Sequence, residues 1–258
     1  MRIISLNIWH GKRKQALRDF LLQEADRTDI FCFQEAGGDN ADEVIDELLA
    51  TGLFQSITAE KQVDADIYYQ IYTLVKRHFQ VERTYQLLND SDASTGQALA
   101  VEVKAGDERV TIVNVHGVPY PGHKLDTEGR LRQTEEIIAA LDVSMSVVVT
   151  GDFNLLPEAR STARFHEAGY RNLIVDWAIP TTRNRHVWER YPNNKQLFAD
   201  YMFTSPSVTV RDFCVPTCEV SDHLPLLLEG VCTKAHESTV NPPSTSVVRQ
   251  NHEDLVVQ

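Results

Sequence analysis

Positive charge is scarce in this sequence: 25 Lys and Arg residues stand against 37 Asp and Glu residues, giving a formal net charge of −12. Proteins that hold duplex nucleic acid by its phosphates usually present a basic face. The balance therefore disfavours tight, sequence-independent binding of long DNA, but it leaves room for a local basic patch formed by Arg183, Arg185 and Arg190. Excess carboxylate suits a Mg²⁺ or Mn²⁺ site, although most of these charges are expected to form a solvated surface.

Long apolar runs are also missing. No segment approaches the roughly 20 residues that a membrane-spanning helix needs. The first residues, MRIISLNIWHG, carry one basic residue and no small-residue cleavage site, so we interpret them as a first strand and not as a signal peptide. The expected compartment is the cytoplasm.

Cysteine is infrequent, with four residues in the chain. Cys32 lies within an apolar segment and is expected in the core. Cys214 and Cys218 are four residues apart, but no histidine pair at zinc-finger spacing accompanies them, so a zinc site is disfavoured. Reduced thiols are the preferred interpretation.

The organisation along the chain indicates one folded domain and a tail. At 258 residues the chain is long for a single domain, but large α/β cores reach this size. Periodic apolar segments run through residues 1–232 without a convincing linker. Residues 233–258 are polar and rich in Pro, Ser and Thr, so they are predicted to be a disordered tail. A monomer is the default oligomeric state.

Apolar periodicity predicts alternating strands and helices. Helical spacing of apolar residues occurs in segments 13–25, 39–50 and 128–142, with Asp126 or Thr127 as the N-cap of the last, and a short helix is expected after Pro157. Two runs separated by KAGDE predict a hairpin. The predicted strands lie around residues 4–8, 29–36, 97–103, 109–117, 146–154, 197–203 and 221–231. The order suggests packed sheets with helices outside.

Polar groups recur where these strands end. Loops at strand ends are where a rigid scaffold displays functional groups, and a set of carboxylates, amides and imidazoles suits a hard, oxygen-preferring cation. Taken singly, each residue is more often a turn residue, a helix cap or a satisfied interior side chain. Their joint occurrence favours metal-assisted phosphoester chemistry. The residues are Asn7, Gln34, Glu35, Asn114, His116, Asp152, Asn154, Asp200, Asp222 and His223.

In this order and spread, LNIW, FQEA, NVHG, GDFN, DYMF and SDHLP resemble the endonuclease/exonuclease/phosphatase superfamily, which includes type I deoxyribonucleases, exonuclease III-like abasic-site endonucleases and inositol polyphosphate 5-phosphatases. The resemblance covers roughly residues 1–230. It implies an α/β fold: a four-layer α/β sandwich of two central mixed β-sheets flanked by helices on both outer faces. It also implies a hydrolase that depends on Mg²⁺ or Mn²⁺.

The resemblance further implies roles for single residues. Glu35 would hold the principal metal, with Asn7 and Gln34 shaping that end of the site. Asp152, with Asn154 beside it, would orient or deprotonate the attacking water. His223 would stabilise the phosphoryl oxygens and be oriented by Asp200. Asp222 would be a metal-side carboxylate or a group that supports the metal ligands, and His116 would lie near the scissile phosphate or the leaving group. Asp200 and Asp222 could exchange roles.

The substrate side is expected in the loop after His116, where Tyr120, Lys124 and Arg130 are the candidate contacts. The chain's acidity favours a small phosphorylated molecule or a short, flexible nucleic acid over long DNA, with an abasic-site or exonuclease-like nuclease as the alternative. A non-catalytic binding module on the same fold would be expected to lose Glu35, Asp152 or His223. All three are present.

Overall fold

The computed structural model describes residues 1–64, 67–88, 96–106 and 108–232. The predicted tail, residues 233–258, and Asp107 in the predicted hairpin turn lie outside this part. The strands are β1 (Arg2–Asn7), β2 (Ile30–Gln34), β3 (Phe54–Asp64), β4 (Ile67–Lys76), β5 (Gln80–Gln86), β6 (Gln97–Ala105), β7 (Glu108–His116), β8 (Val147–Asp152), β9 (Arg171–Asn172), β10 (Asp200–Thr204), β11 (Val208–Cys214) and β12 (Leu226–Cys232). The helices are the 3-10 turn η1 (Trp9–Gly11), α1 (Lys14–Ala25), α2 (Asp39–Ala50), α3 (Glu128–Ala139), α4 (Arg160–Glu167), α5 (Leu173–Asp176) and α6 (Arg185–Arg190).

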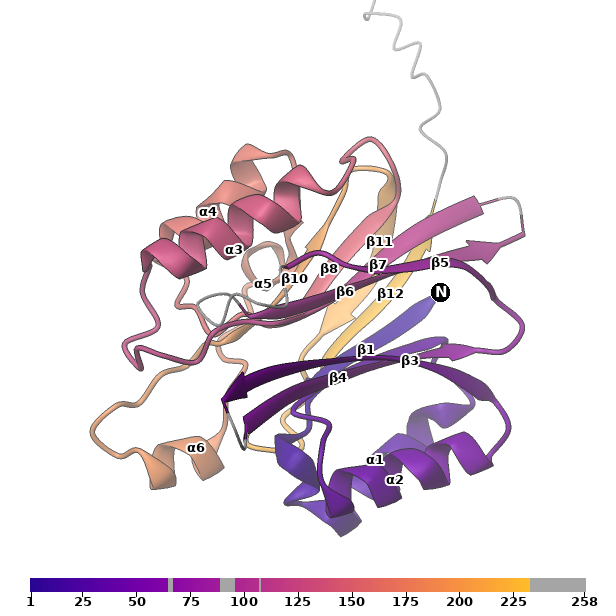
Figure 1. Ribbon diagram of the computed structural model, residues 1–258, viewed down its shortest axis with the longest axis horizontal. Helices are drawn as coiled ribbons and strands as arrows, with labels where there is room; N and C mark the ends of the chain where they lie inside the picture. The colour runs from indigo at the N-terminus through magenta and orange to yellow at the C-terminus, as the bar shows by residue number, and fades with distance from the viewer. Residues whose placement is uncertain (65–66, 89–95, 107, 233–258) are drawn as a thin grey trace, which may run out of the picture.

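Two six-stranded sheets stack face to face, with strand orders β11-β12-β1-β2-β4-β3 and β5-β6-β7-β8-β10-β9. Helices α1 and α2 cover the outer face of the first sheet, and α3 and α4 cover that of the second (Figure 1). Both sheets combine parallel and antiparallel pairs. The predicted four-layer α/β sandwich is therefore confirmed.

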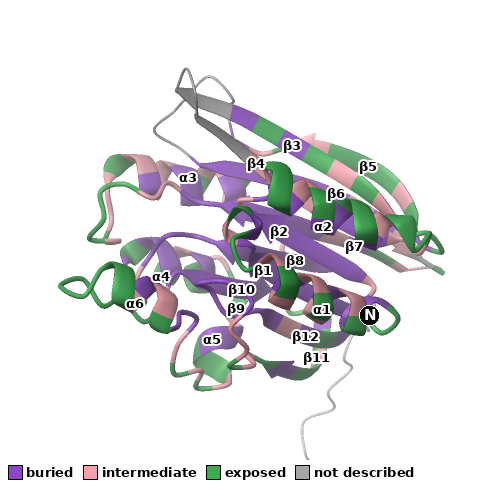
Figure 2. Ribbon diagram, turned by 90° about the horizontal axis from the view of Figure 1, so that it is seen from below, coloured by how far each residue is buried: buried purple, intermediate pink, exposed green. Residues whose placement is uncertain are grey.

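The period-two pattern of β1 decides which side chains face which layer. Ile4 and Leu6 pack with α1 and α2 in one apolar cluster, whereas Ile3 belongs to the cluster between the sheets. Because successive side chains of a strand point to opposite faces, Asn7 points between the sheets, as Ile3 does. Figure 2 shows the central strands buried while the outer helices expose one face to solvent. The polar end of β1 thus points inward.

Strand pairing brings the polar ends together at one edge of the sandwich. Asn7 is in register with Gln34 in the parallel pair β1–β2, and Asp152 is in register with His116 in the parallel pair β7–β8 and with Asp200 in β10. At Gly151, which has a φ of +140°, an added Cβ would come within 2.0 Å of a backbone oxygen of β7, so only glycine fits this close approach. Asp152 is therefore held directly against β7.

The expected elements agree well with those observed. The helices predicted at 39–50 and after Pro157 correspond to α2 and α4, and Thr127 caps α3 by accepting a hydrogen bond from the backbone N of Arg130 at 3.2 Å. The predicted strands did not include β3, β4, β5, β9 or β11. Strand β5 lies at a sheet edge and most of its residues are exposed, so it lacks the apolar alternation that reveals a half-buried strand. None of the helices in the described part of the chain is long and apolar enough to cross a membrane.

Candidate active site

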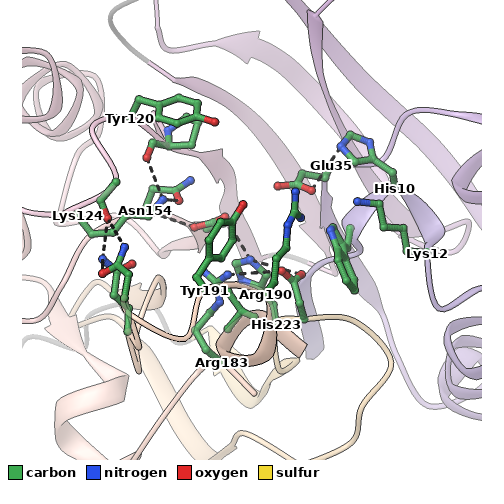
Figure 3. Close-up of a pocket in the computed structure, with 18 residues that line it drawn as sticks. His10, Lys12, Glu35, Tyr120, Lys124, Asn154, Arg183, Arg190, Tyr191 and His223 are labelled. Carbon is green, nitrogen blue, oxygen red and sulfur yellow. Dashed lines mark hydrogen bonds and ion pairs between the residues drawn. The ribbon is translucent and has the colours of Figure 1, made fainter. Parts of the chain in front are cut away.

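A cleft of about 410 Å³ opens at the edge where β1, β2, β7 and β8 end. Its walls come from both sheets, from the loop after β7 and from the segment around α6 (Figure 3). The cleft thus lies where four strand ends and two long loops meet. Of the predicted site residues, the lining includes Glu35, Tyr120, Lys124, Asp152, Asn154, Asp222 and His223.

The Asp152 carboxylate is fixed from both sides. Its Oδ2 accepts a hydrogen bond from Asn7 Nδ2 at 3.0 Å, and its Oδ1 accepts one from the backbone N of Asn154 at 2.9 Å. Burial opposes ionisation, but His223, His116 and nearby cationic side chains outweigh it and hold the pKa of Asp152 below its usual value. Asp152 is thus an oriented, ionised carboxylate, and Asn7, fully buried, acts on it across the two sheets.

His223 is held by Asp200. Its Nδ1 lies 2.9 Å from both carboxylate oxygens of Asp200, and its Nε2 lies 3.7 Å from Asp152 Oδ2. Burial and Arg183 would lower the pKa of His223, but Asp200, Asp152 and Asp222 outweigh them and raise it. A carboxylate on Nδ1 leaves Nε2 to face the cleft as a cationic donor. Of the two candidates for orienting His223, the geometry favours Asp200.

Glu35, His116 and Asp152 form a group that could hold a metal ion. One potential ligand atom from each lies within 4.8 Å of the others. Burial opposes ionisation of Glu35, but His116, His223 and His10 outweigh it and lower its pKa. Burial lowers the pKa of His116, which leaves a neutral imidazole available as a ligand. Two carboxylates and one imidazole suit Mg²⁺ or Mn²⁺. A second group consists of Asp152, Asp200 and His223, in which the imidazole is already hydrogen-bonded to Asp200 through Nδ1 and lies 3.7 Å from Asp152 Oδ2 through Nε2.

The backbone around the cleft is unusually often left-handed. Six non-glycine residues of the described chain have a positive φ, and five of them line the cleft. Such conformations cost about 1–3 kcal/mol each and persist only where surrounding structure enforces them, often at functional sites. The gathering of five such residues in one cleft supports placing the functional site there. The five residues are Trp9, His10, Glu35, Lys124 and Asn154.

The loop after β7 delivers Lys124 to the cleft. Lys124 Nζ donates to the backbone O of Pro119 at 3.0 Å and to Asn154 Oδ1, while Asn154 Nδ2 donates to Gly117 O at 2.9 Å. Asn154 is therefore locked by the same loop. Tyr120, which is 78% exposed, forms the outer lip.

Arg130 was predicted to contact substrate, and its position does not support that role. The side chain is fully buried, and its guanidinium donates to the backbone oxygens of Val118, Pro121 and Leu125 at 2.6–3.4 Å. It does not line the cleft. Arg130 lies in the first turn of α3, and its hydrogen bonds hold the loop that carries Lys124.

Replacing Arg130 by alanine is therefore expected to lower the free energy of unfolding by roughly 2–4 kcal/mol, because buried carbonyl oxygens would lose their donors. Urea denaturation measures the change. The control is Arg164→Ala, since Arg164 pairs with Glu167 on the surface of α4 and its loss should cost less than about 0.5 kcal/mol. Equal midpoints for the two variants would contradict the assigned role.

Arg183 and His10 are cleft residues that the site prediction did not contain. His10 Nε2 lies 3.4 Å from Glu35 Oε2, and Arg183 Nη2 lies 3.5 Å from Asp222 Oδ2. Asp222 belongs to neither candidate metal group of the described chain. The position of His10 in the turn η1, which follows β1, was the available signal for it. The sequence indicated Arg183 only as one member of a basic patch with Arg185 and Arg190. In the structure Arg185 instead pairs with Glu219 on the surface.

The cleft reverses the charge balance of the chain. Its lining has the four cations Lys12, Lys124, Arg183 and Arg190 against the three carboxylates Glu35, Asp152 and Asp222. The whole sequence has 25 Lys and Arg against 37 Asp and Glu. An anionic ligand would therefore be attracted to this cleft more than to the rest of the surface.

Comparisons with known proteins agree with the fold. The sequence matches the model of the Endonuclease/Exonuclease/phosphatase family over residues 4–223. The fold is similar to the human Nocturnin catalytic domain (TM-score 0.70, 17% identity, covering 90% of this chain and 93% of that one). It is also similar to an endonuclease/exonuclease/phosphatase from Bacteroides vulgatus (TM-score 0.69, 19% identity, 90% and 98% coverage). A mannosyl-6-phosphatase from Bacteroides thetaiotaomicron is similar as well (TM-score 0.65, 16% identity, 90% and 99% coverage). No curated protein sequence matches significantly.

Proposed function

Because this chain belongs to the endonuclease/exonuclease/phosphatase family, we propose that it is a divalent-metal-dependent phosphoesterase that hydrolyses a phosphodiester or phosphomonoester by attack of water. The observation that carries the proposal is the line Asp200–His223–Asp152. Asp200 fixes the imidazole of His223 through Nδ1, and Nε2 of His223 lies 3.7 Å from the ionised carboxylate of Asp152. Asp152, His223 and Glu35 line the same cleft. Residues 1–232 would form the catalytic domain.

In this proposal Asp152 orients the attacking water through its fixed carboxylate oxygens and accepts the proton of that water. Its lowered pKa keeps it in the ionised form that has a lone pair free to accept. The water oxygen forms the new bond to phosphorus, and the bond to the leaving oxygen breaks with its electron pair on that oxygen. His223, positively charged, donates from Nε2 to the non-bridging oxygens as charge develops there. Asn154 lies beside Asp152 and lines the same wall.

Glu35, with His116 and Asp152, would hold the metal ion, which we propose to be Mg²⁺ or Mn²⁺. When bound, such an ion offsets the charge of the phosphate and thereby lowers the barrier to attack by water. The donor set fits this choice because two of the three groups offer carboxylate oxygens and none offers a thiolate. Asn7 would act through Asp152, to which it donates its amide N–H.

For the substrate we favour a small phosphorylated molecule or the end of a short nucleic acid. The cations are confined to a cleft of about 410 Å³ within an acidic protein, which suits a compact anion better than a long duplex. A nuclease acting on single-stranded ends is the second candidate. It is favoured by the exposed rings of Tyr120 (78%) and Tyr191 (48%) on the rim, where bases could stack.

We further propose that the protein acts as a monomer in the cytoplasm. The free thiols of Cys32, Cys214 and Cys218 fit a reducing compartment. No pair of these cysteines is joined by a disulfide.

The direct test is a screen of turnover with Mg²⁺ or Mn²⁺ on generic phosphodiesters, phosphomonoesters, abasic DNA and single-stranded DNA. We expect hydrolysis of at least one class, and that class separates phosphatase from nuclease. A folded protein that binds metal but hydrolyses none of them would contradict the proposal.

Replacing Lys124 by alanine is expected to raise KM about tenfold with a smaller effect on kcat, because its charge attracts the substrate but does not take part in bond breaking. Burial lowers the pKa of Lys124 to about 8, so KM should rise as the pH passes that value and the ammonium loses its proton. Steady-state kinetics between pH 6.5 and about 9.5 measure both effects. The control is Lys104→Ala, because Lys104 lies at the end of β6 away from the cleft, paired with Arg109 of β7. An unchanged KM in the Lys124 variant would remove it from the substrate side.

A further inference from the structure

Arg183 enters the cleft beside His223, and its backbone is firmly placed. The two residues form an isolated antiparallel bridge, and Figure 3 shows both side chains on the same wall of the cleft. The preceding residue, Thr182, accepts hydrogen bonds from the backbone N atoms of Ala199 and Asp200 through Oγ1, and its backbone O accepts one from Leu224 N at 2.8 Å. The segment is thus tied both to the start of β10 and to the loop that carries His223.

The guanidinium of Arg183 is buried without being satisfied. The residue is 7% exposed, and its only ion-pair partner in the described chain is Asp222, whose Oδ2 lies 3.5 Å from Nη2. No hydrogen bond of the described residues uses the guanidinium, and Nε is a buried donor without an acceptor. Burying a charge with unused donors is costly unless it serves an anion that binds there.

The neighbours of Arg183 show which anion that would be. His223 Nε2, which lies on the same wall, is 3.7 Å from Asp152 Oδ2 and 3.9 Å from Asp222 Oδ1. A phosphoryl group placed against His223 and Asp152 would therefore also meet the guanidinium. The planar fork of an arginine matches two oxygens of a phosphate and bears a charge at any physiological pH.

We propose that Arg183 is a further catalytic residue, which donates hydrogen bonds to the non-bridging oxygens of the phosphoryl group during hydrolysis, and that Asp222 is the positioning residue that orients its guanidinium. The proposal rests on the phosphoesterase function inferred above. It gives Asp222 a role that differs from the predicted metal-side carboxylate. The contact with Arg183, at 3.5 Å, and the absence of Asp222 from both candidate metal groups of the described chain support this role.

The test of Arg183 has a binding readout and a kinetic one. Binding of inorganic phosphate, measured by calorimetry with Mn²⁺ present, should weaken at least tenfold in Arg183→Ala. With the substrate found in the screen, kcat/KM should fall roughly 10²–10³-fold, as it does when one preorganised donor is removed. Guanidinium ion at low, non-denaturing concentration should restore part of kcat, whereas a purely structural arginine would not respond to it. Arg183→Lys, which keeps the charge but not the fork, should lie between the wild type and the alanine variant.

The matched control is Arg185→Ala, two residues away, whose side chain pairs with Glu219 on the surface and should change neither readout. A folded Arg183→Ala protein with normal phosphate binding and normal kcat/KM would overturn the proposal. If Arg183→Ala fails to fold, the lysine variant carries the same two readouts. A wild type that binds phosphate but turns over no ester would contradict the phosphoesterase function instead, while the loss of phosphate binding would still support Arg183 as an anion ligand.

A double-mutant cycle tests Asp222. If Asp222 acts through Arg183, Asp222→Asn should lower kcat/KM in the wild type but have little further effect in Arg183→Ala, and Mn²⁺ affinity should stay unchanged. Additive losses, or Mn²⁺ binding weakened at least tenfold by Asp222→Asn, would overturn the positioning role and favour metal ligation.

Discussion

Replacing His223 by alanine is expected to lower kcat roughly 10³-fold on the substrate that the screen identifies, within the range that a positioned acid–base group contributes. The physical reason is the arrangement around the ring: Asp200 holds Nδ1 at 2.9 Å, and Asp200, Asp152 and Asp222 together raise the pKa of His223. The wild type therefore keeps a donor directed into the cleft that stays cationic to a higher pH than a free imidazole would. Alanine has no such donor.

Steady-state kinetics measure the loss, and circular dichroism with urea denaturation shows whether the variant folds. The control is His166→Ala, because His166 is exposed on α4, away from the cleft. Asp200→Asn supplies an independent check. It should lower the pKa of His223, measured by NMR titration of the metal-free protein, since the carboxylate that stabilises the imidazolium becomes neutral. Near-normal turnover by a folded His223→Ala protein would refute the assignment of the site.

Removing the metal is expected to have an effect at least as large. EDTA should abolish turnover and Mg²⁺ or Mn²⁺ should restore it, because the charge of the phosphate would otherwise repel the attacking oxygen. Glu35→Gln should weaken Mn²⁺ binding at least tenfold, since a neutral amide replaces a carboxylate of the candidate metal group. Electron paramagnetic resonance of free Mn²⁺ measures this affinity without reference to activity.

The matched control for the metal is Glu43→Gln, because Glu43 pairs with Lys14 on the surface of α2 and should not change Mn²⁺ affinity. Turnover that persists in EDTA would contradict metal dependence. Normal Mn²⁺ affinity in Glu35→Gln would instead show that Glu35 is not a principal ligand.

These predictions depend on an arrangement in which an acidic protein gathers its cations at one place. Lys12, Lys124, Arg183 and Arg190 share a cleft with the carboxylates, so attraction of an anion is local. Substrate binding should therefore weaken less steeply with salt than the binding of a duplex by a protein that contacts many of its phosphates. This is the physical reason for favouring a compact substrate.

The sequence predicted much of the fold because burial imposes periodicity. Ile4, Leu6 and Ile8 alternate with inward-facing polar residues because one face of β1 packs on helices and the other on the second sheet. The helix at 39–50 was found to the residue because its apolar stripe and its flanking residues agree. Strand β5 escaped notice since an exposed edge strand carries no such pattern.

The residues of the candidate site were predictable where they lie at the end of a buried strand. Asp152, His116 and Glu35 follow buried apolar runs directly, and parallel neighbours end at the same edge of a sheet. Arg130 and Arg183 could not be judged this way. Both are arginines in polar segments, yet one is buried against loop carbonyls and the other lies in the wall of the cleft.

The sequence alone thus determined most of the buried strands and helices and the set of chemical groups, because apolar periodicity and short polar motifs are local properties. The resemblance carried by those motifs supplied the family and, with it, the four-layer architecture. Only the tertiary structure decided what each polar group faces. Asn7 in one sheet donates to Asp152 in the other. Asp200, and not Asp222, is the partner of His223 Nδ1, and Asp222 lies against Arg183. Those pairings depend on how two sheets and two loops pack in space, and no spacing along the chain records that.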